Sequence, residues 1–172
     1  MAVREIFRFP DKRLRARAKT VERFDAELER LIEDMAETMY DGRGVGLAAP
    51  QIGVPLRIFV IDVANNEDDA PSDLRVFVNP QIVNAEGEVI WNEGCLSFPG
   101  VREDVKRAER VKVQAKEATG TPFELEAEDL LAVAIQHEND HLQGQLIIDH
   151  LSPLRRRLLG RAMAKREANE PA

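Results

Sequence analysis

Two histidines four residues apart, in a stretch with helical periodicity, restrict the fold of this chain more than any other feature. The stretch reads His137-Glu138-Asn139-Asp140-His141, and the 172-residue chain contains only three histidines. On a helix, residues i and i+4 lie on one face, so both imidazoles point the same way at the spacing of two metal ligands. The pattern predicts a metal-binding helix, with Glu138 beside the two histidines.

A catalytic metal site of this kind needs a third protein ligand and one open position, so another segment must contribute. The only cysteine, Cys95, stands in the segment Glu93-Gly94-Cys95-Leu96-Ser97. A thiolate and two imidazoles suit Zn, Fe, Co or Ni. Spacing alone leaves Cys95 open between a ligand and a small buried residue. Asp149 and His150 lie beyond the helix-ending Gly144 and are less suited as ligands.

A third segment, Gly44-Val45-Gly46-Leu47-Ala48-Ala49-Pro50-Gln51, is rich in small residues and ends in an amide. Its glycines allow the backbone to approach a ligand closely. Three segments follow one another in the chain: this one, then Glu-Gly-Cys-Leu-Ser, then Gln-His-Glu-Asn-Asp-His. In this order they resemble the three signature motifs of the peptide deformylases. The resemblance covers nearly the whole chain, from Phe9-Pro10-Asp11 to Asp149-His150-Leu151-Ser152-Pro153. It is similar to the bacterial type of the family with a C-terminal helix.

The resemblance implies a metal-dependent hydrolase that removes the formyl group from the N-terminal formyl-methionine of newly synthesised polypeptides and releases formate. It makes Cys95, His137 and His141 the ligands of one divalent metal, which activates a water for attack on the formyl carbon. The resemblance points to Fe(II), and Zn, Ni or Co can bind the same three ligands. Glu138 would transfer the proton, and the amide of Gln51 and the backbone N–H of Leu96 would stabilise the oxyanion.

The substrate pocket expected from the resemblance combines backbone that pairs with an extended peptide and an apolar site for the methionine side chain. Reading these positions as ordinary core is about equally justified residue by residue. We also expect Arg102 and Glu93 to form an ion pair that supports the site. The expected pocket residues are Val45, Gly46, Gly94, Trp91, Arg102, Leu130, Val133 and Ala134.

Hydrophobic periodicity predicts an α+β fold in which antiparallel or mixed sheets wrap around the metal-binding helix, with an N-terminal and a C-terminal helix. One helix begins after Asp25 and ends near Gly42, and the metal-binding helix covers about 129–142. The length favours one catalytic domain over residues 1–172. Strand-like runs occur at 56–63, 75–83, 88–91, 110–115 and near 122–126.

Charge is unevenly distributed along the chain. The net charge is −7, and residues 147–172 carry six Lys/Arg and three Asp/Glu, or +3, so the rest carries −10. A globally acidic chain is a poor candidate for binding DNA. The basic stretch predicts a C-terminal helix over about 153–168, with Leu154, Leu158, Leu159 and Met163 turned inward. Its positive charges could dock the protein on the ribosome, from which the substrate emerges.

The remaining composition bears on the compartment. A single cysteine excludes an internal disulfide, and no apolar run approaches the roughly 20 residues of a membrane span. The N-terminal 25 residues contain several arginines but also Glu5, Asp11, Glu22 and Asp25, so we expect no targeting peptide. We therefore expect a cytoplasmic protein that does not bind a membrane.

Two other functions remain open from the residues alone. A zinc protease with His-Glu-x-x-His and an unrecognised third ligand would cleave inside peptides and tolerate Cys95→Ser. A non-catalytic module in which the metal only joins two segments would tolerate changes of Glu138 and Gln51.

Overall fold

The computed structural model describes residues 2–169, and within them the strands form two antiparallel units. A five-stranded sheet has the order β1-β2-β3-β6-β7, and β4 and β5 form a separate two-stranded ribbon. The sheet strands are β1 (Gly46–Ala48), β2 (Ile58–Ile61), β3 (Arg75–Glu86), β6 (Arg110–Lys116) and β7 (Pro122–Glu128). The ribbon strands are β4 (Val89–Cys95) and β5 (Phe98–Arg107).

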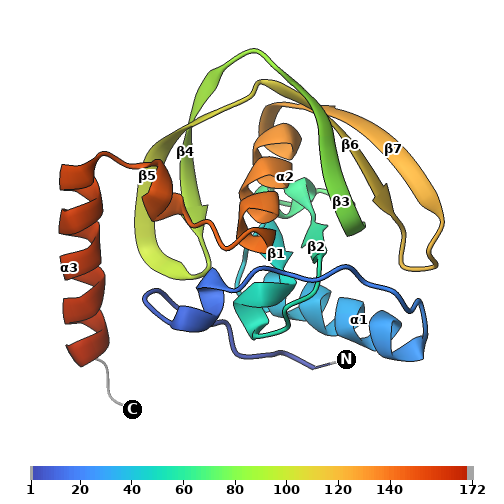
Figure 1. Ribbon diagram of the computed structural model, residues 1–172, viewed down its shortest axis with the longest axis horizontal. Coiled ribbons are helices and arrows are strands. Elements are labelled where there is room, and N and C mark those ends of the chain that lie inside the picture. Colours follow the sequence, from blue (N-terminus) through green and yellow to red (C-terminus); the bar gives the residue numbers. More distant parts are fainter. Residues whose placement is uncertain (1, 170–172) are drawn as a thin grey trace.

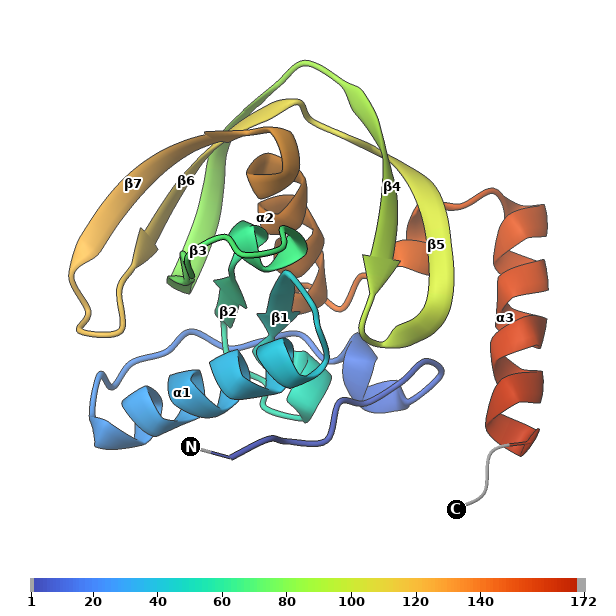
Figure 2. The same cartoon turned by 180° about the vertical axis from the view of Figure 1, so that it is seen from behind.

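Helix α2 (Asp129–Leu142) lies at the centre, enclosed by the sheet on one side and the β4–β5 ribbon on the other (Figures 1 and 2). Its residues Ala132, Ile135 and Leu142 join a buried cluster with apolar side chains of the sheet. Helix α2 ends before Gly144, whose φ of 74° reverses the chain direction. The α+β class, with sheets wrapped around the helix that carries both histidines, is thereby confirmed.

Helix α1 (Ala26–Asp41) covers β1 and β2. The Asp25 side chain accepts a hydrogen bond from the backbone N–H of Leu28, which satisfies one of the free donors of the first turn. Residues at helical spacing, Leu28, Ile32, Met35 and Met39, are buried against the second apolar cluster. The Gly44–Gly46 segment follows this helix, and its Gly46 packs against Glu138 of α2.

Helix α3 (Pro153–Asn169) stands at the edge of the molecule, beside the β4–β5 ribbon (Figures 1 and 2). Leu159 and Met163 are buried in the third apolar cluster, as predicted. Leu154 and Leu158 are 62% and 48% exposed, so the prediction that they turn inward is wrong. The helix touches the rest of the protein along one narrow stripe, and these two leucines lie on its outer side.

Four short 3₁₀ helices connect these elements: Lys12–Arg15, Ala49–Ile52, Val63–Asn66 and Ile147–His150. The sequence patterns did not reveal β1, which has only three residues, or β5, whose outward-facing residues are mostly charged. Among residues 2–169, no helix combines the length and the apolar character needed to cross a membrane.

Candidate active site

The structure brings the three predicted metal ligands together. Cys95 is the last residue of β4, and His137 and His141 lie one turn apart on α2. One ligand atom from each lies within 4.8 Å of the others, and Cys95 Sγ is 3.5 Å from His141 Nε2. One thiol and two imidazole nitrogens at this separation fit a single divalent ion of the first transition row. Burial, together with the nearby His137, lowers the pKa of His141 well below its usual value, which favours the neutral form that binds metal.

The ring of His137 is oriented by a buried ion pair. His137 Nδ1 lies 2.8 Å from Glu93 Oε1, which leaves Nε2 for a metal. Arg107 donates two hydrogen bonds to the Glu93 carboxylate, at 2.7 and 2.8 Å. Burial would raise the pKa of Glu93, but hydrogen bonds from Arg107 and His137 outweigh it and lower the pKa to about 2. Glu93 therefore stays ionised and holds the imidazole in place.

The predicted ion pair between Arg102 and Glu93 is wrong, and the reason is strand register. Arg102 is paired with Gly94, and successive residues of a strand point to opposite faces, so Arg102 lies on the face away from Glu93. Arg107 pairs with Val89 and shares the face of Glu93. Arg102 instead donates to Asn92, at 2.8 Å to both its side-chain and its main-chain oxygen.

The buried network continues from Arg107 to the surface. Arg107 Nη1 lies 2.7 Å from Asp140 Oδ2, and the same oxygen lies 2.8 Å from His150 Nε2. Single-sequence reasoning missed Arg107 and Asp140, because no local pattern links an arginine on β5 to a carboxylate on α2. His150 lies outside the ligand group and helps to hold Asp140.

Glu138 is buried beside the ligand group and forms no ion pair within residues 2–169. Its side chain is 4% exposed, and its Oε2 atom has no hydrogen-bond partner among the described residues. The Glu138 side chain packs against the Gly46 backbone, where a β-carbon would come within 2.6 Å of Oε1. Burial raises the pKa of Glu138 to about 7, close to the value at which a carboxylate can both take and return a proton near neutral pH.

Gln51 lies on the other side of Cys95, in the 3₁₀ helix Ala49–Ile52. Its Oε1 accepts from the Ala48 backbone N–H at 2.9 Å, which fixes the orientation of the amide. Its Nε2 donates to Ser97 Oγ at 3.0 Å and lies 3.7 Å from Cys95 Sγ. An amide nitrogen carries two hydrogens, and the second one is donated toward Cys95 Sγ, so it points at the ligand group. Ser97, fully buried, is a positioning residue that sequence reasoning missed.

A cavity of about 610 Å³ opens onto these groups. It contains Gln51, Cys95, Leu96, His137 and Glu138 in its wall, so both expected oxyanion donors and the expected base share one space. All eight residues expected in the substrate pocket also line it: Val45, Gly46, Trp91, Gly94, Arg102, Leu130, Val133 and Ala134. Arg43 and Phe98 line it as well, and neither was expected from the sequence.

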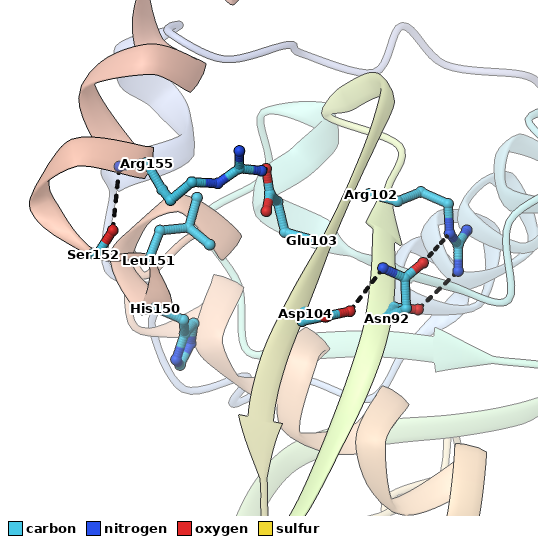
Figure 3. A pocket seen from close by; sticks show the side chains of 8 residues that line it. All are labelled: Asn92, Arg102, Glu103, Asp104, His150, Leu151, Ser152 and Arg155. Atoms are coloured by element: carbon cyan, nitrogen blue, oxygen red, sulfur yellow. Dashed lines mark hydrogen bonds and ion pairs between the residues drawn. The ribbon is translucent and has the colours of Figure 1, made fainter.

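A second, polar pocket of about 480 Å³ lies between the β4–β5 ribbon and the start of α3 (Figure 3). Arg102 lines both pockets. Figure 3 shows its guanidinium group turned toward Asn92, whose amide in turn donates to Asp104 at 2.9 Å. This chain of contacts holds Arg102 between the two pockets.

Comparison with known proteins identifies the family. The profile of the family described as polypeptide deformylase matches residues 3–157. A peptide deformylase of Chromobacterium violaceum is 48% identical over 97% of this chain and 98% of its own length. Among solved structures, a peptide deformylase of Legionella pneumophila has 50% identity and a TM-score of 0.89 over 99% of this chain and 100% of its own. One from Ehrlichia chaffeensis in complex with actinonin has 36% identity and a TM-score of 0.91, over 97% and 99% of the two chains. The chain belongs to the polypeptide deformylase family.

Proposed function

We propose that this cavity is where the protein, a peptide deformylase, hydrolyses the formyl amide of formyl-methionyl polypeptides. Cys95, His137 and His141 would hold one divalent metal, which supplies when bound an activated water and positive charge beside the developing oxyanion. The observation that carries the proposal is the group of three donor atoms within 4.8 Å, next to a buried carboxylate and an oriented amide.

Glu138 acts as the proton carrier in this proposal. Its buried carboxylate shares the cavity with Cys95 and His137, and its Oε2 has no other hydrogen-bond partner among residues 2–169. It takes a proton from the attacking water and delivers it to the leaving amine, so that formate and a free N-terminal methionine are released. A pKa of about 7 suits both halves of this transfer.

Two donors stabilise the negative charge that develops on the formyl oxygen. The Gln51 amide is held at its oxygen by Ala48, so its nitrogen does not need to reorganise when charge appears. Leu96 follows Cys95 directly and lines the same cavity, which makes its backbone N–H the second donor. Removing one donor of this kind typically costs about 10²–10³ in kcat.

The walls of the cavity fit an extended peptide. Val45 and Gly46 lie on one wall and Gly94 on the other, and backbone pairing with both accepts many sequences after methionine. The apolar Leu130, Val133 and Ala134 would receive the methionine side chain. Trp91 and Arg102 complete the pocket.

We further propose Fe(II) as the native ion, with Zn, Ni or Co able to replace it, and the cytoplasm as the place of action. A thiolate with two imidazoles binds all four ions, and availability in the cell decides between them. We also treat residues 1–172 as one catalytic domain. Metal analysis of protein purified without oxygen tests the assignment of iron, because a Cys-ligated ferrous site is sensitive to oxidation.

The decisive experiment measures formate released from a formyl-methionyl tripeptide by protein loaded anaerobically with Fe(II). We expect rapid release by the native protein and a loss of about 10²-fold or more in Glu138→Ala at equal metal content. Cys95→Ser should lose metal as well as activity. Cleavage inside the peptide, or metal binding without formate, would instead support a protease or a structural metal.

Helix α3 provides a surface for docking on the ribosome. Arg157, Arg161 and Lys165 have no ion-pair partner within the part of the chain that the structure describes. By helical periodicity they share the outer face with the exposed Leu154 and Leu158. Arg155 and Arg166, by contrast, bind Glu103 and the Pro99 carbonyl.

Neutralising the three outer basic residues to Gln should reduce co-sedimentation with ribosomes and should leave tripeptide deformylation unchanged. Neutralising Arg23, on the N-terminal segment, is the control. Equal co-sedimentation of all variants would remove this docking proposal without affecting the proposed chemistry.

A further inference from the structure

The exposed charged side chains that line the substrate cavity are positive, although the protein as a whole is acidic. Arg43 and Arg102 line the cavity from its two walls: Arg43 precedes the Val45–Gly46 wall, and Arg102 is paired with Gly94 on β4. The two acidic residues that line the cavity, Glu93 and Glu138, are 5% and 4% exposed and lie at its floor. Glu93 is already paired with Arg107.

The guanidinium of Arg102 is held in place by hydrogen bonds, and no ion pair within the described residues neutralises its charge. Its Nε and Nη2 donate to Asn92 oxygens, which are neutral acceptors (Figure 3). Its Nη1 lies over the Gly94 backbone, 3.0 Å from the point that a β-carbon there would occupy. The guanidinium therefore stands next to the strand edge where an extended peptide would lie, and no carboxylate binds it directly among the described residues.

Arg43 is held in an unfavourable backbone conformation at the same mouth. Its φ of 57° lies in the left-handed region, where a residue with a β-carbon is strained and glycine is favoured. Glycines stand on both sides of it, yet this position keeps a long cationic side chain. Its exposed side chain has no ion-pair partner within residues 2–169. Strained residues of this kind concentrate at ligand sites.

The acidic connector after β2, residues 65–73, places none of its carboxylates in the wall of this cavity. Of its residues, only Asn66 is part of the cavity wall. The neighbouring Glu67, Asp68 and Asp69 are exposed and lie outside that wall. Asn65 ties the connector to the Gly44 carbonyl at 2.8 Å, which keeps the neutral Asn66 at the rim.

We propose that Arg43 and Arg102 select substrates by charge, so that formyl-methionyl peptides with Asp or Glu close after the methionine are preferred over those with Lys or Arg. Successive side chains of an extended peptide that pairs with Gly94 point to opposite faces, and Arg102 lies on the face of Gly94, so one of the next two positions after methionine lies on the side of Arg102. The inference rests on the proposed deformylase function and adds a substrate class to it. Because both guanidinium groups are exposed, the effect is moderate and sensitive to salt.

The test compares kcat/KM for formate release from amidated formyl-Met-Xaa-Yaa-Ala peptides with Asp, Asn or Lys at Xaa or Yaa. Amidation removes the terminal carboxylate, which would itself bind arginine. At low ionic strength we expect the Asp peptide to exceed the Lys peptide about 5-fold at one of the two positions, with Asn between them. In about 0.5 M salt this ratio should fall toward one.

Matched variants separate the two arginines from the background charge. Arg43→Gln and Arg102→Gln should each reduce the Asp/Lys ratio, and the double variant should bring it close to one. Arg110→Gln, on β6 away from the cavity, should retain the full ratio. Arg43→Gln alters only an exposed side chain, so it remains informative if an Arg102 variant folds poorly.

The remaining outcomes each contradict one of the two proposals. Equal rates for the Asp and Lys peptides, with normal formate release, would overturn charge selection and leave deformylation intact. Preference for Lys would also overturn it and would assign control of the mouth to the acidic connector. Absence of formate from every peptide would overturn the proposed function and the inference that rests on it.

Discussion

At the scale of single residues, burial of the Glu138 carboxylate lowers the stability of the fold near neutral pH and raises the pKa of the group. The carboxylate is buried, its Oε2 lacks a hydrogen-bond partner among the described residues, and its pKa is about 7 compared with an ordinary value of 4.5. Between these two values the folded protein holds a proton that the unfolded chain has released. The free energy of unfolding therefore falls as pH rises through this window.

Replacing this carboxylate should stabilise the metal-free protein at the pH where the enzyme works. Glutamine does not titrate, so the native protein alone loses stability as pH rises. From pH 4 to pH 8, the free energy of unfolding of Glu138→Gln should increase by about 3 kcal/mol relative to that of the native protein, since one pKa unit corresponds to about 1.4 kcal/mol. Urea unfolding of both metal-free proteins across this range measures the difference. A difference that stays constant with pH would show that Glu138 titrates normally.

The absence of a side chain at Gly46 leaves the space that Glu138 occupies. A β-carbon there would lie 2.6 Å from Glu138 Oε1 and 3.0 Å from its Cγ, so Gly46→Ala must displace the Glu138 carboxylate. We expect deformylation to fall by about 10-fold or more, because misplacement of about 1 Å is costly, while the metal ligands stay untouched. Formate release at measured metal content tests this.

Gly160→Ala serves as the matched control for this substitution. Gly160 lies within α3, and nothing is within 4 Å of the β-carbon that alanine would add. Activity should not change, and the free energy of unfolding should rise by about 0.5–1 kcal/mol because alanine favours the helix. Equal loss of activity in both variants would mean that steric displacement of Glu138 is not the cause.

At the scale of elements, the site is formed jointly by α2 and the β4–β5 ribbon. Helix α2 supplies the two histidines of the proposed metal site and Asp140, and the ribbon supplies Cys95, Glu93 and Arg107. Arg107 links the two elements, because its buried guanidinium forms ion pairs with Glu93 on β4 and Asp140 on α2. Removing a buried cation leaves two carboxylates uncompensated, which typically costs about 3–5 kcal/mol.

A conservative variant should separate support of the metal from folding. Arg107→Lys keeps the charge but loses the two parallel hydrogen bonds that hold Glu93, and through it His137. We expect release of metal to a chelator to accelerate about 10-fold, the lower end of the effects known for such outer contacts. Arg102→Lys, whose contacts are to Asn92, should release metal at the native rate. Equal rates in all three proteins would remove Arg107 from the support of the metal site.

At the scale of the whole molecule, α3 is fastened by few side chains. Leu159 is 8% exposed and belongs to the third apolar cluster, whereas the adjacent Leu158 is 48% exposed. Leu159→Ala should lower the free energy of unfolding by about 2–4 kcal/mol, and Leu158→Ala should stay within about 0.5 kcal/mol. Urea unfolding of the two variants measures the difference. Similar small losses would mean that α3 adds little to the stability of the domain.

Local patterns were sufficient for the elements on which the site is built. The spacing of His137, Glu138 and His141 and the helical period around them place all three on one helix without reference to the rest of the fold. Asp25 as a cap and the apolar period of α1 were likewise readable, because hydrogen bonds and side-chain direction within a helix depend on neighbours three or four residues away.

The contacts between these elements could be seen only in the tertiary structure. Cys95 meets the histidines because the β4–β5 ribbon closes over α2, and that approach has no local signature in the sequence. Strand register, which changes the face of every side chain when shifted by one residue, assigned Arg107 and not Arg102 to Glu93. Packing along one stripe of α3 likewise turned Leu154 outward. The sequence by itself determined which residues could perform the chemistry, since that depends on their functional groups and helical spacing; the tertiary structure decided which charges neutralise one another, since that depends on contacts between distant segments.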